Sequence, residues 1–421
     1  MKKKIWIFNH YATKMFDEKA GRHFWFAEYL KKKGYEPIIF CASTIHNSHK
    51  RIRIESNYKI EEKNGIPFVI IKTPDYKGNG KQRIINMLSF YKNIIPISKE
   101  YARLNGKPDL ILASSVHPLT LVAGIKLSKE FKVSCISEVR DLWPETLVAY
   151  GSISPNSLIA KFLYMGEKWI YKNSDKIIFT MPGGIDYIKG KSWDLESGGP
   201  INLKKVKYIN NGVDLESFNF LKEHNKIDDE DIKNQNIFKV IYTGSISKAN
   251  NVKKLVDIAK YLSDKNENHV KILIFGEGLQ KKVLEEYCLK NNLQNIVFKG
   301  HVDKKYIPFI LSKSNLNIFH FEQNSLKKYG ASLNKMFEYF ASRKPVLSDC
   351  EFGYDLIKKH NCGTVIDNGT VEQLATEVLR ISKLSQIEYE SYCDNAYNLA
   401  KSYDFKLLTD KLEGLFEYKN I

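Results

Sequence analysis

Small residues ahead of a helix give the chain its strongest chemical signal. The stretch YGASLNKMFEYFASRKPVLSD runs from Tyr329 to Asp349, and Gly330 and Ser332 keep its first turn narrow. Because small side chains let backbone N–H groups approach an anion at a helix N-terminus, this turn predicts a binding site for a phosphate or a diphosphate. The apolar segment KPVLSD that follows is expected to be a buried strand.

Polar residues of the same helix extend this prediction. Asn334 is expected to cap the helix, and Lys335 adds a positive charge near its N-terminus. Glu338, one turn further on, supplies a carboxylate that can accept hydrogen bonds from two ribose hydroxyls. The alternative is that Lys335 and Glu338 form an ordinary pair on the helix surface. A phosphate-binding turn and a carboxylate together favour a nucleotide site.

A second small turn is YTGSISKANN, at residues 242–251. Gly244 and Ser245 keep this turn small, and Lys248 can reach a phosphate. The turn lacks the GxxxxGK[ST] spacing of a Walker A loop, so ATP hydrolysis is not predicted. An ordinary strand-to-helix turn is the alternative.

Two further glycine turns follow predicted strands in the same half of the chain. IFGEGL (274–279) and FKGHV (298–302) place Glu277, Gly300 and His301 at strand ends. Glycines at the carboxyl ends of parallel strands commonly build the rim of a nucleotide site. Each turn is weak evidence alone, but their order along one sheet predicts such a rim.

Three positions in the first half of the chain also follow predicted strands. Gly21 stands where a strand gives way to a helix, so a phosphate or sugar could approach the backbone there. His117, in SSVHP, is expected at the carboxyl edge of a sheet, with a packing histidine as the alternative. Arg140 and Asp141, in SEVRDLWPETL, could orient a sugar or exchange a proton, or could form a salt-bridged loop.

Apolar segments and amphipathic stretches alternate along almost the whole chain. EPIIFC (36–41) and VKILIFGEG (270–278) are typical of buried strands, whereas Arg22–Lys33 and Asn334–Ala341 are typical of helices. This alternation predicts parallel sheets covered on both faces. With 421 residues, the chain is expected to form two doubly wound α/β domains that divide between Ser192 and Lys239.

The composition of the chain limits the classes of binding partner that we expect. A formal net charge of +17 predicts attraction to nucleic acid, an anionic membrane surface or a phosphorylated substrate. No helix-turn-helix, zinc-finger or RNP signature accompanies the charge, which argues against nucleic acid. Six scattered cysteines without a CxxC pair argue against a disulfide framework or a zinc site. No apolar run is long enough to span a bilayer, so we expect a cytoplasmic protein.

One basic segment suggests contact with a membrane surface. Residues 79–107 contain six Lys or Arg against one Glu, interleaved with large apolar side chains. This pattern fits an amphipathic segment that lies on anionic lipid. An ordinary helix with a basic outer face is the alternative.

Taken together, EVRDLWPE (138–145), INNGVD (209–214) and the turns described above resemble a GT-B glycosyltransferase of family 4. This group is retaining and uses nucleotide-sugar donors, and the chain is similar to its bacterial O-antigen, capsule and exopolysaccharide enzymes. The resemblance implies two facing Rossmann-like domains. Residues 1–200, joined by a returning helix at 402–421, would bind the acceptor, and residues 205–400 would bind the donor.

Within this family, Glu338 matches the second glutamate of the E-x7-E motif and would bind ribose. Gly330 stands where the first glutamate is usual. Ser245 stands at the position of a usual diphosphate-binding Arg, and Asn250 stands near that of a usual Lys. Two other lysines, at positions 248 and 335, would then replace that pair.

Arg140–Asp141 matches the stretch where many family members carry His–Asp, close to the reacting sugar. The resemblance implies same-face attack, with the leaving phosphate accepting the acceptor's proton. Asp141 and His117 would then position groups and stabilise charge.

The expected donor is a UDP-sugar, carrying an N-acetylated amino sugar or a deoxy sugar, with no metal ion. The expected acceptor is lipid-linked at the inner face of the cytoplasmic membrane, where the protein would be peripheral. A UDP-sugar 2-epimerase of the same fold is one alternative, and a basic nucleic-acid-binding or scaffold protein is another.

Overall fold

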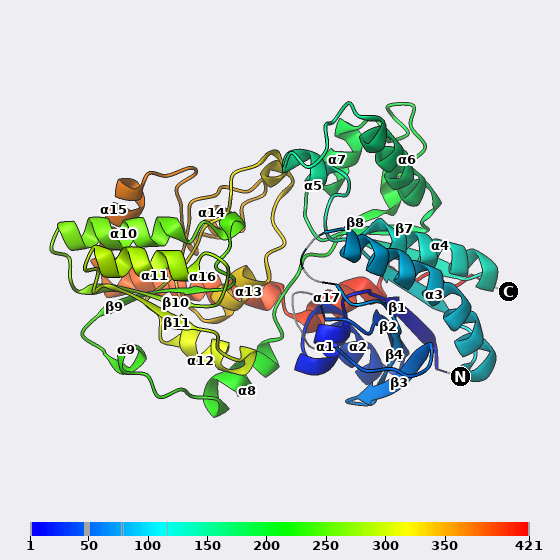
Figure 1. The fold of residues 1–421 in the computed structure, drawn as a ribbon, viewed down its shortest axis with the longest axis horizontal. Coiled ribbons are helices and arrows are strands. Elements are labelled where there is room, and N and C mark those ends of the chain that lie inside the picture. The colour runs from blue at the N-terminus through cyan, green and yellow to red at the C-terminus, as the bar shows by residue number, and fades with distance from the viewer. Residues whose placement is uncertain (1, 46–50, 77, 79, 116, 420–421) are drawn as a thin grey trace. The chain divides into compact units, whose positions relative to one another are not determined.

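The computed structural model describes residues 2–45, 51–76, 78, 80–115 and 117–419. Contacts divide the chain into two compact units. Unit 1 comprises Met1–Asn210 and Phe405–Ile421, and unit 2 comprises Asn211–Asp404 (Figure 1). Each unit is built around its own sheet.

Unit 1 contains an eight-stranded sheet in the order β3-β4-β2-β1-β5-β6-β7-β8. Neighbouring strands are parallel except for the β3–β4 pair. The inner strands are almost wholly buried, as expected when helices cover both faces of a parallel sheet. The strands are β1 Lys4–Phe8, β2 Glu36–Ala42, β3 Tyr58–Lys63, β4 Ile66–Ile71, β5 Leu110–Ser114, β6 Ser134–Val139, β7 Lys176–Phe179 and β8 Val206–Tyr208.

The helices of unit 1 include the last helix of the chain, α17, which packs against α2. α3 and α6 both pack against α4. Among the described helices, none is both long and apolar enough to cross a membrane. The helices are α1 Thr13–Glu18, α2 Arg22–Lys32, α3 Lys81–Asn105, α4 Pro118–Phe131, α5 Glu145–Ala149, α6 Leu158–Asn173, α7 Gly184–Gly190 and α17 Phe405–Glu413.

Unit 2 contains a six-stranded, all-parallel sheet in the order β11-β10-β9-β12-β13-β14. Its strands are β9 Phe238–Thr243, β10 Val270–Phe275, β11 Ile296–Gly300, β12 Leu316–Phe319, β13 Val346–Ser348 and β14 Gly363–Val365. Alternate residues of β9 enter different cores, because Val240 packs with α10 and Ile241 packs with α13.

Helices cover both faces of this sheet (Figure 1). They are α8 Leu215–His224, α9 Glu230–Lys233, α10 Lys253–Asp264, α11 Lys281–Lys290, α12 Ile307–Ser312, α13 Asn334–Ala341, α14 Leu356–His360, α15 Val371–Ser382 and α16 Gln386–Ser402. The prediction of two doubly wound α/β units is confirmed. In such sheets, ligands bind beyond the carboxyl ends of the strands, and the candidate residues gather there.

Candidate active site

The turn after β9 is narrow because Gly244 has no side chain. Its φ is +144°, a value that favours glycine, and its N–H donates to the carbonyl of Phe275 at 3.0 Å. A Cβ added to Gly244 would lie 3.1 Å from both Lys335 Nζ and the Tyr242 hydroxyl. Glycine therefore leaves the space that the lysine occupies.

Lys335 extends from the first turn of α13 to this glycine turn. Its Nζ donates to the Tyr242 hydroxyl and to Asn250 Oδ1, both at 3.2 Å, and lies 4.6 Å from the centre of the Tyr242 ring. Burial lowers the pKa of Lys335 to about 8, although the charge of Glu338 opposes this shift. A cation with few carboxylate neighbours is thus held beside the turn.

The same turn is fixed by Asn250. Its Nδ2 donates to the carbonyl and hydroxyl oxygens of Ser245, at 3.1 and 2.8 Å, and to Ser247 Oγ at 3.1 Å. Ser245 and Lys248 are exposed, and the latter begins a short 3-10 helix. The turn therefore has a rigid backbone and a second lysine at its surface.

The turns after β10 and β11 pack directly on the turn after β9. A Cβ on Gly276 would lie 1.8 Å from the carbonyl oxygen of Gly244, so only glycine fits there. The Gly276 N–H donates to the carbonyl of Gly300 at 2.8 Å, and the Ile246 N–H donates to that of Glu277 at 2.8 Å. The glycine rim predicted from the sequence is therefore a continuous backbone layer.

The side chains of that rim differ in their surroundings. Glu277 pairs with Lys281 at 2.6 Å, and its Oε1 would lie 3.2 Å from a Cβ on Gly300. Gly300 has a φ of +74°. His301 is exposed just after β11. Glu277 is thus engaged by a neighbouring lysine, whereas His301 faces solvent.

The loop before α13 contains a buried hydroxyl. Gly330, with a φ of +93°, ends a 3-10 helix at Ser325–Tyr329. Asn211 Nδ2 donates to the carbonyl of Ser332 at 2.8 Å and so fixes the loop backbone. The Oγ of Ser332 is buried and has no hydrogen-bond partner among the described residues. This hydroxyl is therefore free to donate to or accept from a group that reaches the loop.

The predicted capping role of Asn334 is wrong. Leu333, with an extended backbone, is the N-cap residue of α13, and Asn334 is the first helical residue. The Asn334 side chain is exposed. It therefore lies beside the loop that contains Ser332 without satisfying the N–H groups of the helix.

Glu338 lies one turn along α13 from Lys335. Its side chain is 22% exposed, and its Oε1 lies 3.7 Å from Lys304 Nζ. The ammonium of Lys335 contacts the turn after β9, as described above, so these two residues do not form the simple helix-surface pair that was the alternative. The Glu338 carboxylate remains accessible to a ligand.

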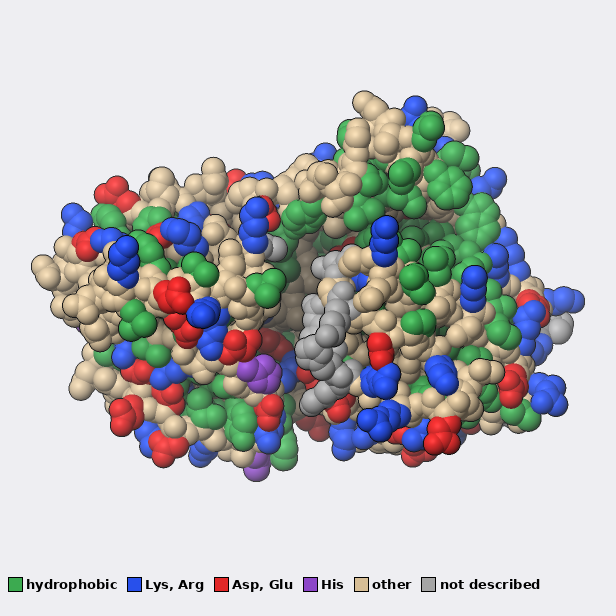
Figure 2. All heavy atoms as spheres, in the orientation of Figure 1, with side chains coloured by type: hydrophobic (Ala, Val, Ile, Leu, Met, Phe, Trp, Pro, Cys, Tyr) green, Lys and Arg blue, Asp and Glu red, His purple; other side chains and the backbone are tan. Residues whose placement is uncertain are grey.

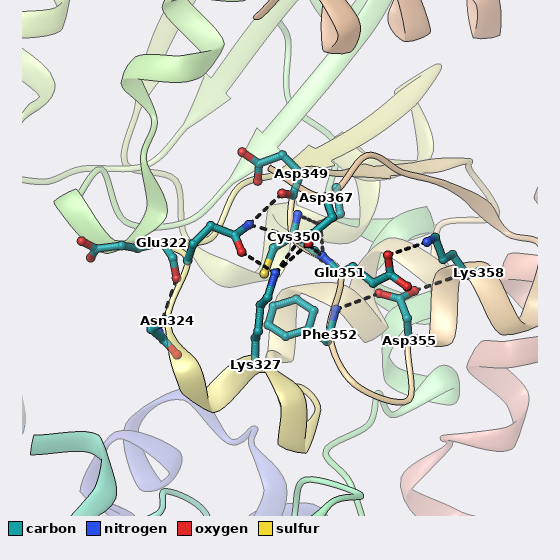
Figure 3. A network of polar contacts seen from close by, with 12 residues as sticks. Glu322, Asn324, Lys327, Asp349, Cys350, Glu351, Phe352, Asp355, Lys358 and Asp367 are labelled. Carbon is teal, nitrogen blue, oxygen red and sulfur yellow. Dashed lines mark hydrogen bonds and ion pairs between the residues drawn. The ribbon is translucent and has the colours of Figure 1, made fainter. Parts of the chain in front are cut away.

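A network of polar contacts anchors the loop that contains Gly330 (Figure 3). Lys327 Nζ donates to Gln323 Oε1 at 2.6 Å and to both oxygens of Asp367 at 2.8 Å. Asp367 also accepts the Glu351 N–H at 2.9 Å. Because Asp367 follows β14 and Glu351 follows β13, the network ties the loop to two strand ends.

Sequence reasoning missed a buried charged group at the same sheet edge. Asp349 follows β13 and accepts a hydrogen bond from Lys254 Nζ at 2.7 Å, while His320 Nδ1 lies 3.0 Å away. Burial alone would raise the pKa of Asp349, but His320 and Lys254 hold it below its ordinary value. Both His320 and Asp349 directly follow strands, which is the signal that could have identified them.

In unit 1, His117 belongs to a buried hydrogen-bonded chain. His10 Nδ1 lies 2.7 Å from His117 Nε2, and His10 Nε2 lies 2.7 Å from Asn86 Oδ1. The Asn86 amide nitrogen donates to the Pro74 carbonyl at 2.6 Å and to Thr44 Oγ1 at 3.1 Å, which fixes the amide orientation. The sequence contained no signal for this partnership.

The hydrogen bonds along this chain indicate which ring nitrogens of His10 and His117 carry a proton. Asn86 Oδ1 only accepts, so His10 Nε2 must donate to it. When His10 is neutral, its Nδ1 accepts and His117 Nε2 donates. Burial lowers the pKa of His117 to about 3, with the charge of Arg83 adding to the shift, so the ring is neutral. Its Nδ1 is therefore an acceptor, and it has no partner among the described residues.

Arg140 and Asp141 lie just past the carboxyl end of β6. The Arg140 N–H donates to Ser115 Oγ at 3.1 Å, and its carbonyl accepts from Thr180 Oγ1 at 3.4 Å. Its side chain is partly exposed, and that of Asp141 is exposed. Glu145, nearby in sequence, instead pairs with Lys191 at 2.5 Å. The loop is fixed by its backbone and leaves the 140–141 side chains accessible.

Gly21 is the N-cap residue of α2 and has a φ of +112°. A Cβ there would lie 3.0 Å from Met15 Cγ. The next two residues contact the buried Glu138 of unit 1. Arg22 Nε donates to Glu138 Oε2 at 2.7 Å, and His23 Nε2 lies 2.9 Å from Glu138 Oε1. Burial would raise the pKa of Glu138, but Arg22 and His23 hold it below its ordinary value. These charges stabilise the interior.

The predicted site residues thus form two groups. In unit 2, the structure brings the Gly244 turn, Lys335 and the glycine rim together, with Ser332 and Glu338 on the adjoining loop and helix. In unit 1, His117 and Arg140–Asp141 follow the neighbouring strands β5 and β6.

Comparison with known proteins identifies glycosyltransferases as similar to this chain. Residues 223–399, most of unit 2, match the family of glycosyl transferases group 1. An uncharacterized glycosyltransferase of Methanocaldococcus jannaschii is 26% identical over 270 residues, which is 62% of this chain and 59% of that protein. A poly(ribitol-phosphate) alpha-N-acetylglucosaminyltransferase of Staphylococcus aureus is 26% identical over 262 residues, covering 59% of this chain and 46% of that protein. The chain thus matches only part of the length of these relatives.

The crystal structure of Anabaena HepE in complex with UDP and glucose has the same fold. It superposes with a TM-score of 0.64 at 14% sequence identity, over 98% of each chain. The chain therefore has the GT-B fold, and residues 223–399 of its second unit match the family of glycosyl transferases group 1.

Proposed function

We propose that the protein is a retaining glycosyltransferase of family 4 that uses a UDP-sugar. The observation that carries this proposal is the Lys335 ammonium, which is held at the Gly244 turn beside the start of α13. The S. aureus relative is named for transfer of N-acetylglucosamine, and HepE was crystallised with UDP. These names favour a UDP-linked donor, and we propose an N-acetylated amino sugar or a deoxy sugar as the group transferred.

In this proposal, unit 2 binds the donor. The diphosphate gains negative charge as the glycosidic bond breaks, and preorganised cations and N–H groups stabilise that charge. Lys335 and Lys248 supply the cations, and the small loop at Gly330 and Ser332 supplies N–H groups beside the N-terminus of α13. Glu338 accepts hydrogen bonds from the ribose hydroxyls.

Unit 1 would hold the acceptor and act on the reacting sugar. Because His117 is neutral and its Nδ1 is an acceptor, it can accept a hydrogen bond from a sugar hydroxyl but cannot serve as an acid. Arg140 and Asp141 orient the sugar in this account. The proton of the attacking hydroxyl passes to the leaving phosphate, which gives retention by attack on the same face.

The lysines and N–H groups supply the positive charge in this scheme, so we propose that no metal ion is required. The described residues contain no group of three or more His, Cys, Asp or Glu side chains that could hold one. Activity in the presence of EDTA tests the proposal directly.

We further propose that the acceptor is a lipid-linked saccharide of surface polysaccharide synthesis. The net charge of +17 favours an anionic surface, and such a surface is where a lipid-linked acceptor would be presented.

A donor screen tests the proposed activity. The protein is incubated with UDP-, GDP- and ADP-linked sugars, with EDTA, and with or without a polyprenyl-diphosphate-linked saccharide in vesicles. We expect UDP release that the acceptor accelerates, and NMR of the product should show the anomeric configuration of the donor. No nucleotide release from any donor, or an inverted product, would contradict the proposal.

Replacing Glu338 tests the donor site within the same assay. Glu338→Ala removes the proposed ribose contact, and we expect the fold to persist while UDP affinity falls by about ten- to one-hundredfold, the effect of losing charged hydrogen bonds. Glu286→Ala, on the exposed surface of α11, is the matched control. Equal affinity of the two variants would exclude the ribose role.

A further inference from the structure

The helix α6 exposes a row of large apolar side chains. Leu158 is 83% exposed, Ile159 64%, Phe162 73%, Met165 69% and Trp169 39%. The spacing of three to four residues places Leu158, Phe162, Met165 and Trp169 along one face of the helix. Figure 2 shows hydrophobic side chains gathered over the part of unit 1 that carries α6. We call these five residues the α6 face.

The α6 face is separate from the residues that attach the helix to unit 1. The opposite side of α6 buries Ala160, Ile170 and Tyr171. Glu167, also buried there, accepts hydrogen bonds from the hydroxyls of Tyr171 at 2.6 Å and Tyr187 at 2.7 Å. The helix is therefore docked firmly without the α6 face. Large contiguous apolar surfaces on soluble proteins mark sites of interaction.

The charged residues around the α6 face indicate what kind of partner it binds. Lys161, Lys168 and Lys172 follow one another at helical spacing and lie along one flank of the α6 face. Lys129 of α4 adds a fourth cation, with its Nζ 5.7 Å from the centre of the Trp169 ring. Throughout α6, all of which the structure describes, the acidic residue is the buried Glu167. A second copy of α6 would bring these lysines no exposed carboxylate.

We infer that the α6 face is the surface by which the protein docks on an anionic lipid bilayer. The inference deepens the proposed function, because it rests on an acceptor presented at a membrane. An interfacial helix of this kind lies parallel to the bilayer, with its apolar side chains among the acyl chains. Its lysines reach the anionic headgroups, and Trp169 lies at the level that tryptophan prefers.

The α6 face is not the segment, residues 79–107, for which the sequence suggests contact with a membrane. Residues 81–105 of that segment form α3, and Asn79 lies outside the described residues. α3 exposes Ile84, Ile85 and Leu88 near its start and Leu104 near its end, whereas Phe90, Ile94 and Ile97 between them are buried. The α6 face exposes more apolar surface on one helix, so it is the stronger candidate.

Vesicle flotation tests the inference with the full chain. Vesicles of phosphatidylcholine, with and without phosphatidylglycerol, are mixed with wild type, with Leu158→Ser/Phe162→Ser/Met165→Ser and with the α3 control Ile84→Ser/Ile85→Ser/Leu88→Ser. We expect wild type and the α3 control to bind the anionic vesicles, and the α6 variant to bind about tenfold or more weakly. Lys161→Ser/Lys168→Ser/Lys172→Ser should remove the preference for anionic over neutral lipid.

A second readout reports on Trp169 itself. Lipids brominated in their acyl chains should quench wild-type fluorescence more than that of Trp169→Phe, because an indole at the interface lies close to the bromine atoms. Equal quenching of the two proteins would contradict the inference. So would vesicle binding lost in the α3 control and kept in the α6 variant, or a wild type that ignores vesicles and forms a dimer that the α6 variant cannot form.

Measurements of UDP binding and of vesicle binding distinguish a failure of this inference from a failure of the proposed function. UDP affinity, measured without vesicles, should be the same in wild type and in the α6 variant, since the changes lie outside unit 2. A protein that binds vesicles through α6 but binds no nucleotide would keep this inference and overturn the proposed function. If the wild type binds UDP and the α6 variant still binds vesicles as tightly as the wild type, the proposed function is kept and this inference is overturned.

Discussion

Lys335 shows how a single partly buried cation could favour the binding of an anion. Its ammonium is held by a hydroxyl and an amide oxygen, at 3.2 Å each, instead of by a carboxylate. Burial lowers the pKa of Lys335 to about 8, and a neighbouring diphosphate would raise it again by favouring the charged form. Binding of a diphosphate at this position would therefore be linked to proton uptake.

This linkage predicts the pH dependence of UDP affinity. Below about pH 8 Lys335 is already charged, so affinity should be nearly constant; above it, affinity should fall by up to roughly tenfold per pH unit, because binding must first protonate the amine. Titration calorimetry from about pH 7 to about pH 10 measures the slope. Lys335→Arg stays charged over this range, so its profile should be flat. A flat wild-type profile would contradict the linkage.

The proton assignment at His117 is testable by NMR. Its pKa of about 3, lowered by burial, predicts a neutral ring with the proton on Nε2 throughout the neutral range. Two-bond ¹H–¹⁵N correlation spectra should show an unprotonated Nδ1 in His117, unchanged between about pH 5 and about pH 8. A shift that titrates within this range, or a proton on Nδ1, would overturn the assignment.

At the residue scale, the sequence could predict only what lies close together along the chain. The placement of Lys335 and Glu338 on one helix followed from their spacing. The partners of Lys335, Tyr242 and Asn250, lie 93 and 85 residues away, and their contact depends on the packing of α13 against the turn after β9. His10, which lies 107 residues from His117, was missed for the same reason.

At the element scale, most helices and strands could be predicted because apolar periodicity decides burial. The helix at 334–341 has the predicted bounds, and α2 ends one residue before its predicted end at Lys33. The strand β3 was missed because its residues are largely polar and partly exposed at the sheet edge, and β8 was missed because only Val206 of its three residues is buried. The cap of α13 could not be assigned because the backbone conformation at Leu333 decides it.

The helix α6 provides a stability test at this scale. Burial raises the pKa of Glu167 to about 8, although hydrogen bonds from Tyr171 and Tyr187 oppose the shift. The folded state therefore holds a proton that the unfolded chain releases above about pH 4.5. The stability from this group is complete below that pH and is lost as the pH rises towards 8.

Glu167→Gln should remove this loss because the amide stays neutral. We expect the variant to exceed wild type in stability by on the order of 2 kcal/mol near pH 8 and to match it near pH 4.5, measured by denaturant unfolding. Glu286→Gln, on the exposed surface of α11, should show no such trend. A constant difference between Glu167→Gln and wild type at all pH values would contradict the buried, protonated carboxyl.

The glycine rim predicts a second effect on an element. Gly276→Ala would place a Cβ 1.8 Å from the Gly244 carbonyl oxygen, and both atoms are fixed by backbone. We expect a loss of about 1–3 kcal/mol in the stability of unit 2, together with weaker UDP binding, because the turn beside Lys335 must shift. Gly80→Ala, with open space around the site, is the control. Unchanged melting and binding in Gly276→Ala would exclude a tight rim.

At the scale of the whole molecule, charge and fold point to different partners. The net charge of +17 indicates only an anionic partner, whereas the glycine rim and Lys335 favour a nucleotide diphosphate. Salt separates the two classes. Binding driven by the release of counterions from nucleic acid falls steeply as salt increases, and binding of UDP inside a formed site should fall much less.

Calorimetric binding of UDP is the most direct test of the account, because it asks whether the residues gathered in unit 2 form a nucleotide site. With EDTA present, we expect wild type and the exposed-lysine control Lys282→Met to bind UDP, and Lys335→Met to bind about tenfold or more weakly, as expected for loss of a charge-assisted contact. A wild type that binds no UDP, or a Lys335→Met variant that binds as tightly as wild type, would show that these residues do not form a UDP site.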